Sequence, residues 1–116
     1  MTRAVLRPRL RLVRDETVLL GPGKADLLEG VRDTGSLRRA AAGLGMSYMR
    51  AWTLVKTMNA AFKAPLVALA RGGARRGGAT LTATGARVLA LYRRMEAQSR
   101  RAVSADAGQL KRFLRK

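Results

Sequence analysis

Apolar and polar positions alternate at the start of the chain and then change to helical spacing. Charged and apolar side chains alternate over residues 9–14, which is the period of a half-buried strand, and residues 17–20 are interpreted as a short returning strand. The Gly-Pro-Gly of 21–23 breaks the pattern. Over 24–33 the apolar residues fall on one face of a helix, so the chain predicts a strand pair followed by a first helix.

Two further helical patterns meet at a short turn around 43–46. Gly35 suits a left-handed end to the first helix, and Ser36 is placed to cap a second helix that buries Leu37, Ala40, Ala41 and Leu44. Ser47 caps a third helix, whose predicted core stripe is Tyr48, Ala51, Trp52, Val55, Met58, Asn59 and Phe62. The opposite face carries Ser47, Met49, Arg50, Thr53, Lys56, Thr57 and Lys63. This arrangement is typical of a helix-turn-helix whose second helix is the recognition helix.

A hairpin and a long helix complete the predicted fold. Apolar residues 66–70 and residues 79–81 are expected to pair as strands around the glycine- and arginine-rich segment 71–78, which forms a wing. Thr82 caps a helix over 83–103 that is longer than a small domain requires, so part of its apolar stripe is expected to meet a partner helix. The predicted class is mainly α with a small β wing: a winged helix-turn-helix domain over 1–103 with a long C-terminal dimerisation helix, and a short basic tail over 104–116.

Charge is distributed unevenly along the chain. The net charge is +17, from 24 Lys and Arg against 7 Asp and Glu, and residues 34–95 contain eleven basic residues but no carboxylate. A continuous polyanion is the natural partner of such a field, so we expect double-stranded DNA. A membrane-surface helix would also need bulky apolar or aromatic residues opposite the charge, and aromatic residues make up only 4% of the chain.

The composition also argues against several classes of function. The chain has no cysteine and no histidine, which leaves out disulfides, thiol nucleophiles, the usual zinc ligands and the commonest general base. We therefore expect no enzyme, no metal site and no cofactor. No apolar run is long enough to span a bilayer, and no signal-peptide pattern is present, so a cytoplasmic, nucleoid-associated protein is expected.

The predicted recognition helix and wing supply candidate DNA contacts. Arg50 can donate two hydrogen bonds to guanine O6 and N7, and Thr53 can reach a phosphate or a thymine methyl group. Phosphate contacts, which add affinity with little sequence preference, are expected from Arg38, Arg39, Lys56, Arg71, Arg75 and Arg76.

Several of these segments resemble the amino-terminal domain of the ModE family of molybdate-responsive regulators, itself similar to the LysR-type winged helix-turn-helix. The resemblance rests on Leu-Gly-Met-Ser-Tyr-Met-Arg-Ala-Trp at 44–52, Met-Asn at 58–59, the glycine-rich wing, Leu-Thr-Ala-Thr-Gly at 81–85 and Leu-Tyr at 91–92. It covers about residues 9–103. It implies a dimer with the Ser47 helix in the major groove, molybdenum-related target genes, and the 71–79 hairpin as wing.

The resemblance also implies roles for single residues. Ser47, Tyr48 and Arg50 match the DNA-facing start of the recognition helix, whereas Trp52 and Asn59 match internal packing and hydrogen-bonding positions. Met49 departs from the family, where a basic residue is frequent. Full-length members carry an oxyanion-binding region after the long helix, and only about thirteen residues follow here, so no molybdate site is carried over.

Two other functions fit the same sequence. High charge on a small body suits an architectural protein that coats DNA with little sequence preference, for which the ratio of specific to random-DNA affinity is the discriminator. A protein-interaction module would instead use the long helix to bind a separate regulator and would bind DNA weakly alone.

Overall fold

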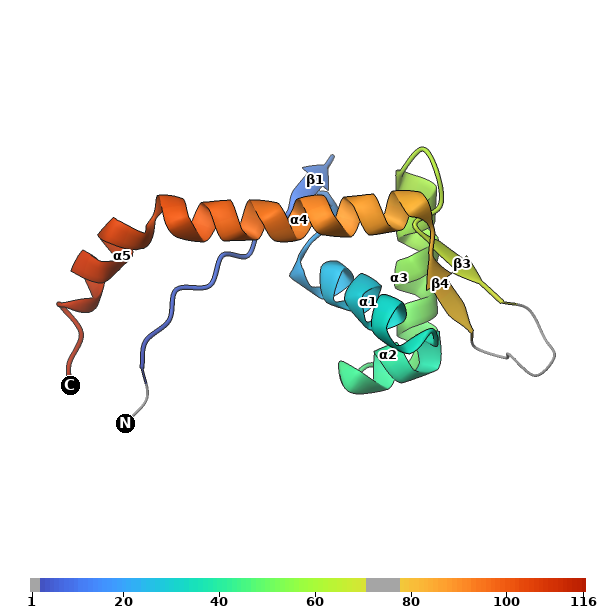
Figure 1. Ribbon diagram of the computed structural model, residues 1–116, viewed down its shortest axis with the longest axis horizontal. Helices are drawn as coiled ribbons and strands as arrows, with labels where there is room; N and C mark the ends of the chain where they lie inside the picture. The colour runs from blue at the N-terminus through green and yellow to red at the C-terminus, as the bar shows by residue number, and fades with distance from the viewer. Residues whose placement is uncertain (1–2, 71–77) are drawn as a thin grey trace.

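The computed structural model describes residues 3–70 and 78–116, and it forms a small helical body with two hairpins and a long C-terminal helix (Figure 1). In chain order the elements are β1 (Leu12–Arg14), β2 (Thr17–Leu20), α1 (Pro22–Thr34), α2 (Leu37–Gly43), α3 (Tyr48–Ala61), β3 (Val67–Leu69), β4 (Ala79–Leu81), α4 (Ala83–Ala102) and α5 (Ser104–Lys111). The predicted class, a winged helix-turn-helix with a C-terminal helix, is confirmed.

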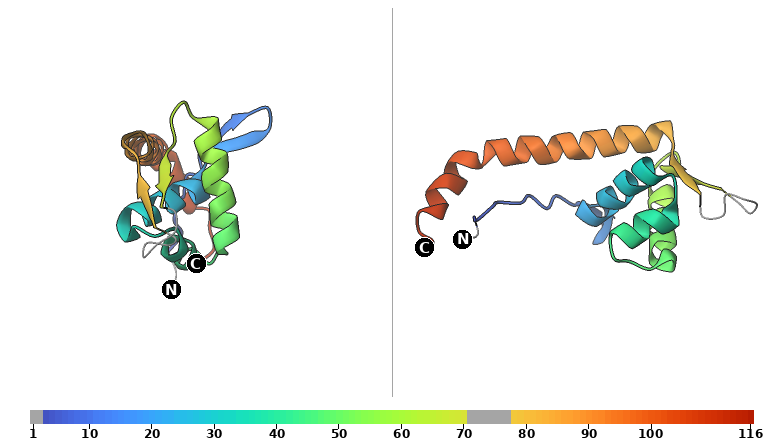
Figure 2. Two further views of the ribbon diagram at one scale, coloured as in Figure 1. Left: turned by 90° about the vertical axis from the view of Figure 1, so that its right-hand side faces the viewer. Right: turned by 60° about the horizontal axis from the view of Figure 1, so that its bottom comes forward.

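Helices α1, α2 and α3 pack around one core beneath the first half of α4 (Figure 2). A Cβ atom on Gly30 of α1 would lie 2.9 Å from the Cβ of Ala40 on α2, so small residues allow these two helices to cross closely. Antiparallel strands β3 and β4 form the wing hairpin, with Ala68 opposite Thr80. The largest fully buried side chains are Leu27, Leu28, Leu37, Met58, Leu66, Val31, Val55 and Val67.

The predicted starts of α2, α3 and α4 are confirmed by their capping hydrogen bonds. Ser36 Oγ accepts from the Arg39 amide and Ser47 Oγ from the Arg50 amide, each at 3.1 Å, and Thr82 Oγ1 accepts from the Gly85 amide at 2.9 Å. Gly35 has the expected left-handed conformation, with a φ of 67°. Contacts within three residues of each cap therefore determine where these helices begin.

Parts of the sequence prediction differ from the structure. Helix α1 begins at Pro22 rather than Lys24, because proline has no amide hydrogen to lose at the first helical position and its φ is already helical. The first strand covers only 12–14 of the expected 9–14. Leu44 follows α2 at its C-cap and is 40% exposed, so it does not extend the buried face.

The N-terminal segment and α4 are held together across the chain. The Tyr92 hydroxyl donates to the Leu10 carbonyl at 2.8 Å, and Arg93 on α4 donates to Asp26 on α1 at 2.8 Å and to Glu29 at 3.2 Å. Beyond this junction α4 projects from the body, the direction changes after Val103, and α5 follows, giving dimensions of 56 × 33 × 24 Å (Figure 1). The expected tail thus contains an eight-residue helix, whereas a domain boundary at residue 103 stays a prediction.

Among the residues that the structure describes, no helix combines the length and the apolar character required to cross a membrane.

Candidate nucleic-acid interface

The outer face of α3 presents hydrogen-bond donors and positive charge to solvent. Ala51, Val55 and Met58 form the buried stripe of this helix. The seven residues predicted for the opposite face are all exposed: Ser47, Met49, Arg50, Thr53, Lys56, Thr57 and Lys63. The helical period thus placed the polar face correctly, and its dimensions suit insertion into a major groove.

Trp52 does not belong to the core stripe, and that part of the prediction is wrong. Its side chain is 36% exposed, and the Lys56 ammonium lies 5.3 Å from the centroid of its ring. One residue corresponds to about 100° around a helix, so Trp52 lies on the flank of the stripe centred on Ala51 and Val55. Leu54, on the other flank, packs against the core instead.

Asn59, by contrast, has the hydrogen-bonding role that the resemblance implied. Its Oδ1 accepts from the amides of Leu66 at 2.8 Å and Val67 at 3.2 Å, and its Nδ2 donates to the Val67 carbonyl at 3.0 Å. One side chain therefore fixes α3 relative to the start of the wing.

Arg38 and Tyr48 are brought together from the two helices of the helix-turn-helix. The Arg38 guanidinium lies 4.6 Å from the centroid of the Tyr48 ring, and the half-buried Tyr48 also packs against the core. A cation held over an aromatic ring keeps its charge while losing freedom. Arg38 is exposed, and its guanidinium lies beside the start of α3.

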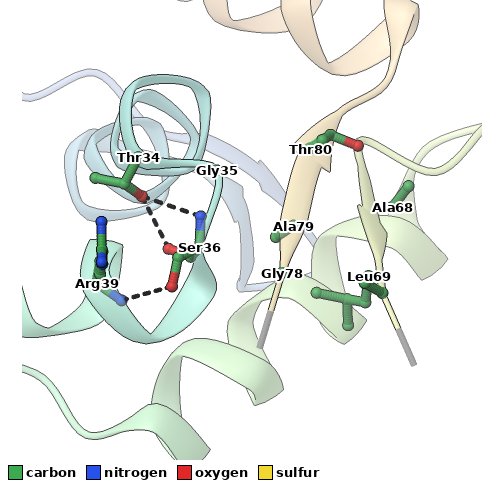
Figure 3. A pocket seen from close by; sticks show the side chains of 10 residues that line it. Thr34, Gly35, Ser36, Arg39, Ala68, Leu69, Gly78, Ala79 and Thr80 are labelled. Atoms are coloured by element: carbon green, nitrogen blue, oxygen red, sulfur yellow. Dashed lines mark hydrogen bonds between the residues drawn. The ribbon is translucent and has the colours of Figure 1, made fainter. Parts of the chain in front are cut away.

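Arg39 lines a groove of about 510 Å³ between the α1–α2 turn and the wing strands (Figure 3). Thr34 and Ser36 lie on the same wall, and Leu69 and Thr80 lie on the other. The Ala79 amide donates to the Gly35 carbonyl at 3.1 Å, which fixes the two walls relative to each other. The candidates Arg71, Arg75 and Arg76 lie outside the described residues.

Acidic side chains are confined to other elements. Helices α2 and α3 contain none, whereas Asp26, Glu29 and Glu96 surround Arg93 at the junction of α1 and α4. Burial lowers the pKa of Arg93, but its hydrogen bonds to Asp26 and Glu96 outweigh burial and raise that pKa above its ordinary value. Arg93 offsets only one of these three negative charges, but the carboxylates lie on α1 and α4 and leave the outer face of α3 without an acidic side chain.

Sequence reasoning missed the pairings within this surface. The Arg38–Tyr48 and Lys56–Trp52 contacts and the groove beside Arg39 depend on how α2, α3 and the wing pack. Of these pairings, the sequence indicates only the contact of Trp52 with Lys56, because their four-residue spacing places both on one side of a helix. Contact of any of these residues with DNA stays a prediction.

Comparison with known proteins identifies the matching family. Residues 24–86 match the model of bacterial regulatory helix-turn-helix proteins of the LysR family. The chain is 38% identical over 96 residues to the molybdenum transport protein ModE of Azotobacter vinelandii, covering 83% of this chain and 36% of that protein.

Two further relatives show the same pattern. The molybdenum-pterin-binding protein MopB of Rhodobacter capsulatus is 41% identical over 78 residues, which cover 67% of this chain and 29% of MopB. The DNA-binding transcriptional dual regulator ModE of Escherichia coli K12 is 35% identical over 83 residues, which cover 72% of this chain and 32% of that protein. The chain thus spans about a third of the length of the curated relatives it matches.

Proposed function

The chain belongs to the LysR family of bacterial regulatory helix-turn-helix proteins, and from this premise we propose that it is a homodimeric, sequence-specific regulator of transcription. The observation that carries the proposal is the outer face of α3, which is exposed, rich in donors and free of carboxylates. Ser47 caps the first turn of this helix, so the side chains that follow are held in a defined geometry. Regulation of transcription is also the function named for several ModE relatives.

In the proposed complex α3 lies in the major groove. Arg50 donates to guanine O6 and N7, and Thr53 contacts a neighbouring base or phosphate. Arg38, Arg39 and Lys56 bind phosphates on either side, together with Arg71, Arg75 and Arg76 of the wing. Ser47 and Tyr48 complete the contact surface at the start of α3. Sequence discrimination therefore resides in α3, and most of the affinity resides in the surrounding basic residues.

We propose that two copies associate through α4 and the β1–β2 hairpin. Leu12 on β1 and Leu91 and Met95 on α4 are exposed and line one apolar groove of about 350 Å³. Burying such a face against a second copy removes apolar surface from water. A two-fold dimer presents two α3 helices to half-sites about 34 to 36 Å apart, one turn of DNA, or a multiple of that distance.

Target genes are proposed from the relatives. ModE of Azotobacter vinelandii is named as a molybdenum transport protein and MopB as a molybdenum-pterin-binding protein. We therefore propose molybdenum-related genes as targets. A heteromeric regulator that supplies an effector response is a second candidate partner, suggested by the length of α4.

Selection of bound sequences from a random DNA pool, at near-physiological salt and without added oxyanion, tests the proposal. We expect enrichment of a palindrome whose half-site centres are about 10 to 10.5 base pairs apart, or a multiple of this spacing. Enrichment of base composition alone, with binding that collapses as salt rises, would instead support an architectural protein, which the net charge of +17 favours.

A further inference from the structure

Met49 is an exposed apolar side chain on the donor-rich outer face of α3. It is the second residue of α3, and at 63% exposed it is the most exposed large apolar side chain of that helix. Ser47, Arg50 and Thr53 surround it in sequence, and each carries a hydrogen-bond donor. Met49 itself has no donor.

The helix geometry directs Met49 away from the core. Met49 and Thr53 each lie two residues from the fully buried Ala51, which places each about 160° around the axis from it on opposite sides. The hydrogen bond between Ser47 Oγ and the Arg50 amide holds the turn that carries Met49. If α3 enters a major groove as proposed, Met49 faces the base edges.

Only one group on those edges matches the chemistry of Met49. Cytosine presents only a smaller C5–H group at that position, and the remaining features of a base pair in the major groove are hydrogen-bond donors and acceptors, whereas thymine adds its 5-methyl group. A methionine placed on a donor or acceptor removes water from it without replacing the hydrogen bond. Resting on the proposed function, we infer that Met49 contacts the 5-methyl group of one thymine in each half-site and so determines specificity there.

Deoxyuridine substitution tests this contact, because uracil lacks the methyl group and keeps the base-pairing edge. Each thymine of the selected palindrome is replaced in turn, and the dissociation constants of the wild-type protein and of Met49→Ala are compared. Wild-type binding should weaken roughly fourfold at one position per half-site, the equivalent of one buried methyl group at about 0.8 kcal/mol. Met49→Ala should show no loss at that position.

Leu110→Ala is the matched control, because Leu110 is 64% exposed but lies on α5. It should respond to deoxyuridine as the wild type does. Equal losses in the wild type and Met49→Ala, or no sensitive position in the wild type, would overturn the inference and leave the proposed function intact. Failure of the earlier selection to yield a palindrome would instead contradict the proposed function itself.

Discussion

Asn59 shows how a single side chain sets the position of the candidate recognition helix. Its side-chain oxygen accepts hydrogen bonds from the amides of Leu66 and Val67, and its side-chain nitrogen donates to the Val67 carbonyl. These residues are buried and lead into β3, so the backbone groups have little access to water. The side chain therefore supplies hydrogen bonds that a regular strand neighbour would otherwise make.

Asn59→Ala should lower the free energy of unfolding by about 1 to 3 kcal/mol, because it leaves buried backbone groups without partners. Chemical denaturation measures this change. Thr57→Ala is the control, since its hydroxyl donates only to the Thr53 carbonyl of its own helix and is exposed. A change no larger than that of the control would contradict the role assigned to Asn59.

Tyr92 joins α4 to the N-terminal segment, and its ionisation makes that junction sensitive to alkali. Burial, aided by Glu96, raises the pKa of Tyr92 above 10.0. The stability that the protonated Tyr92 hydroxyl contributes is therefore present in full below pH 10, and it is lost as the pH rises through the higher pKa of the folded state.

Tyr92→Phe should lower the free energy of unfolding by about 0.5 to 1.5 kcal/mol at pH 8, which is the net contribution of one hydrogen bond. The difference in unfolding free energy between wild type and Tyr92→Phe should narrow above pH 10, as followed by denaturation at a series of pH values. Lysine titration affects both proteins and cancels in the difference. A difference in unfolding free energy that stays constant or widens as the pH rises would contradict this role of Tyr92.

At the scale of elements, α4 docks onto the loop that precedes the wing. The Thr82 amide donates to the Leu66 carbonyl at 3.0 Å, and a Cβ atom on Gly85 would lie only 2.0 Å from that carbonyl oxygen. Glycine is therefore required by close packing one turn into the helix. This contact fixes the direction in which the long helix leaves the body.

Gly85→Ala should destabilise the protein by about 1 to 3 kcal/mol or more, because the backbone of Leu66 must move. Gly108→Ala is a matched glycine substitution in α5 with nothing within 4 Å of the added atom, and it should raise stability by about 0.5 to 1 kcal/mol. Thermal unfolding of both variants measures the contrast. Similar effects from the two substitutions would contradict the packing argument.

Elements whose signals are local were predictable from the sequence. The caps at Ser36, Ser47 and Thr82 lie within three residues of the amides they bind, so composition and spacing revealed them. The period of α3 gave its outer face but misassigned Trp52, because a bulky apolar residue on the flank of a stripe resembles a core residue. The pairing of Tyr92 with Leu10 depends on packing across 82 residues, which no local pattern encodes.

At the scale of the whole molecule, the candidate DNA-reading face and the apolar groove lie on different elements. Arg38, Arg39, Arg50 and Lys56 are exposed on α2 and α3, whereas the exposed apolar residues Leu12, Leu91 and Met95 gather along β1 and α4. Their different positions allow the proposed DNA contact and the proposed self-association to occur at once. Association of two copies would double the phosphate contacts and steepen the dependence of affinity on salt.

Replacing Leu91 and Met95 together by aspartate should yield a monomer in sedimentation experiments, because burying two carboxylates in an apolar interface is costly. Affinity for the full palindrome should fall to that for one half-site. Leu110→Asp, at an exposed position on α5, should leave both properties unchanged. A double variant that remains dimeric would contradict the assigned interface.

The ratio of two dissociation constants tests the central claim, that α3 reads DNA sequence, most directly. One is measured on the selected palindrome and the other on a scrambled duplex of equal length and composition, at one fixed salt concentration. We expect the palindrome to bind at least about a thousandfold more tightly, and Arg50→Ala to reduce that ratio by roughly tenfold or more. A ratio near one, unchanged by Arg50→Ala, would contradict the account and support an architectural DNA-binding protein.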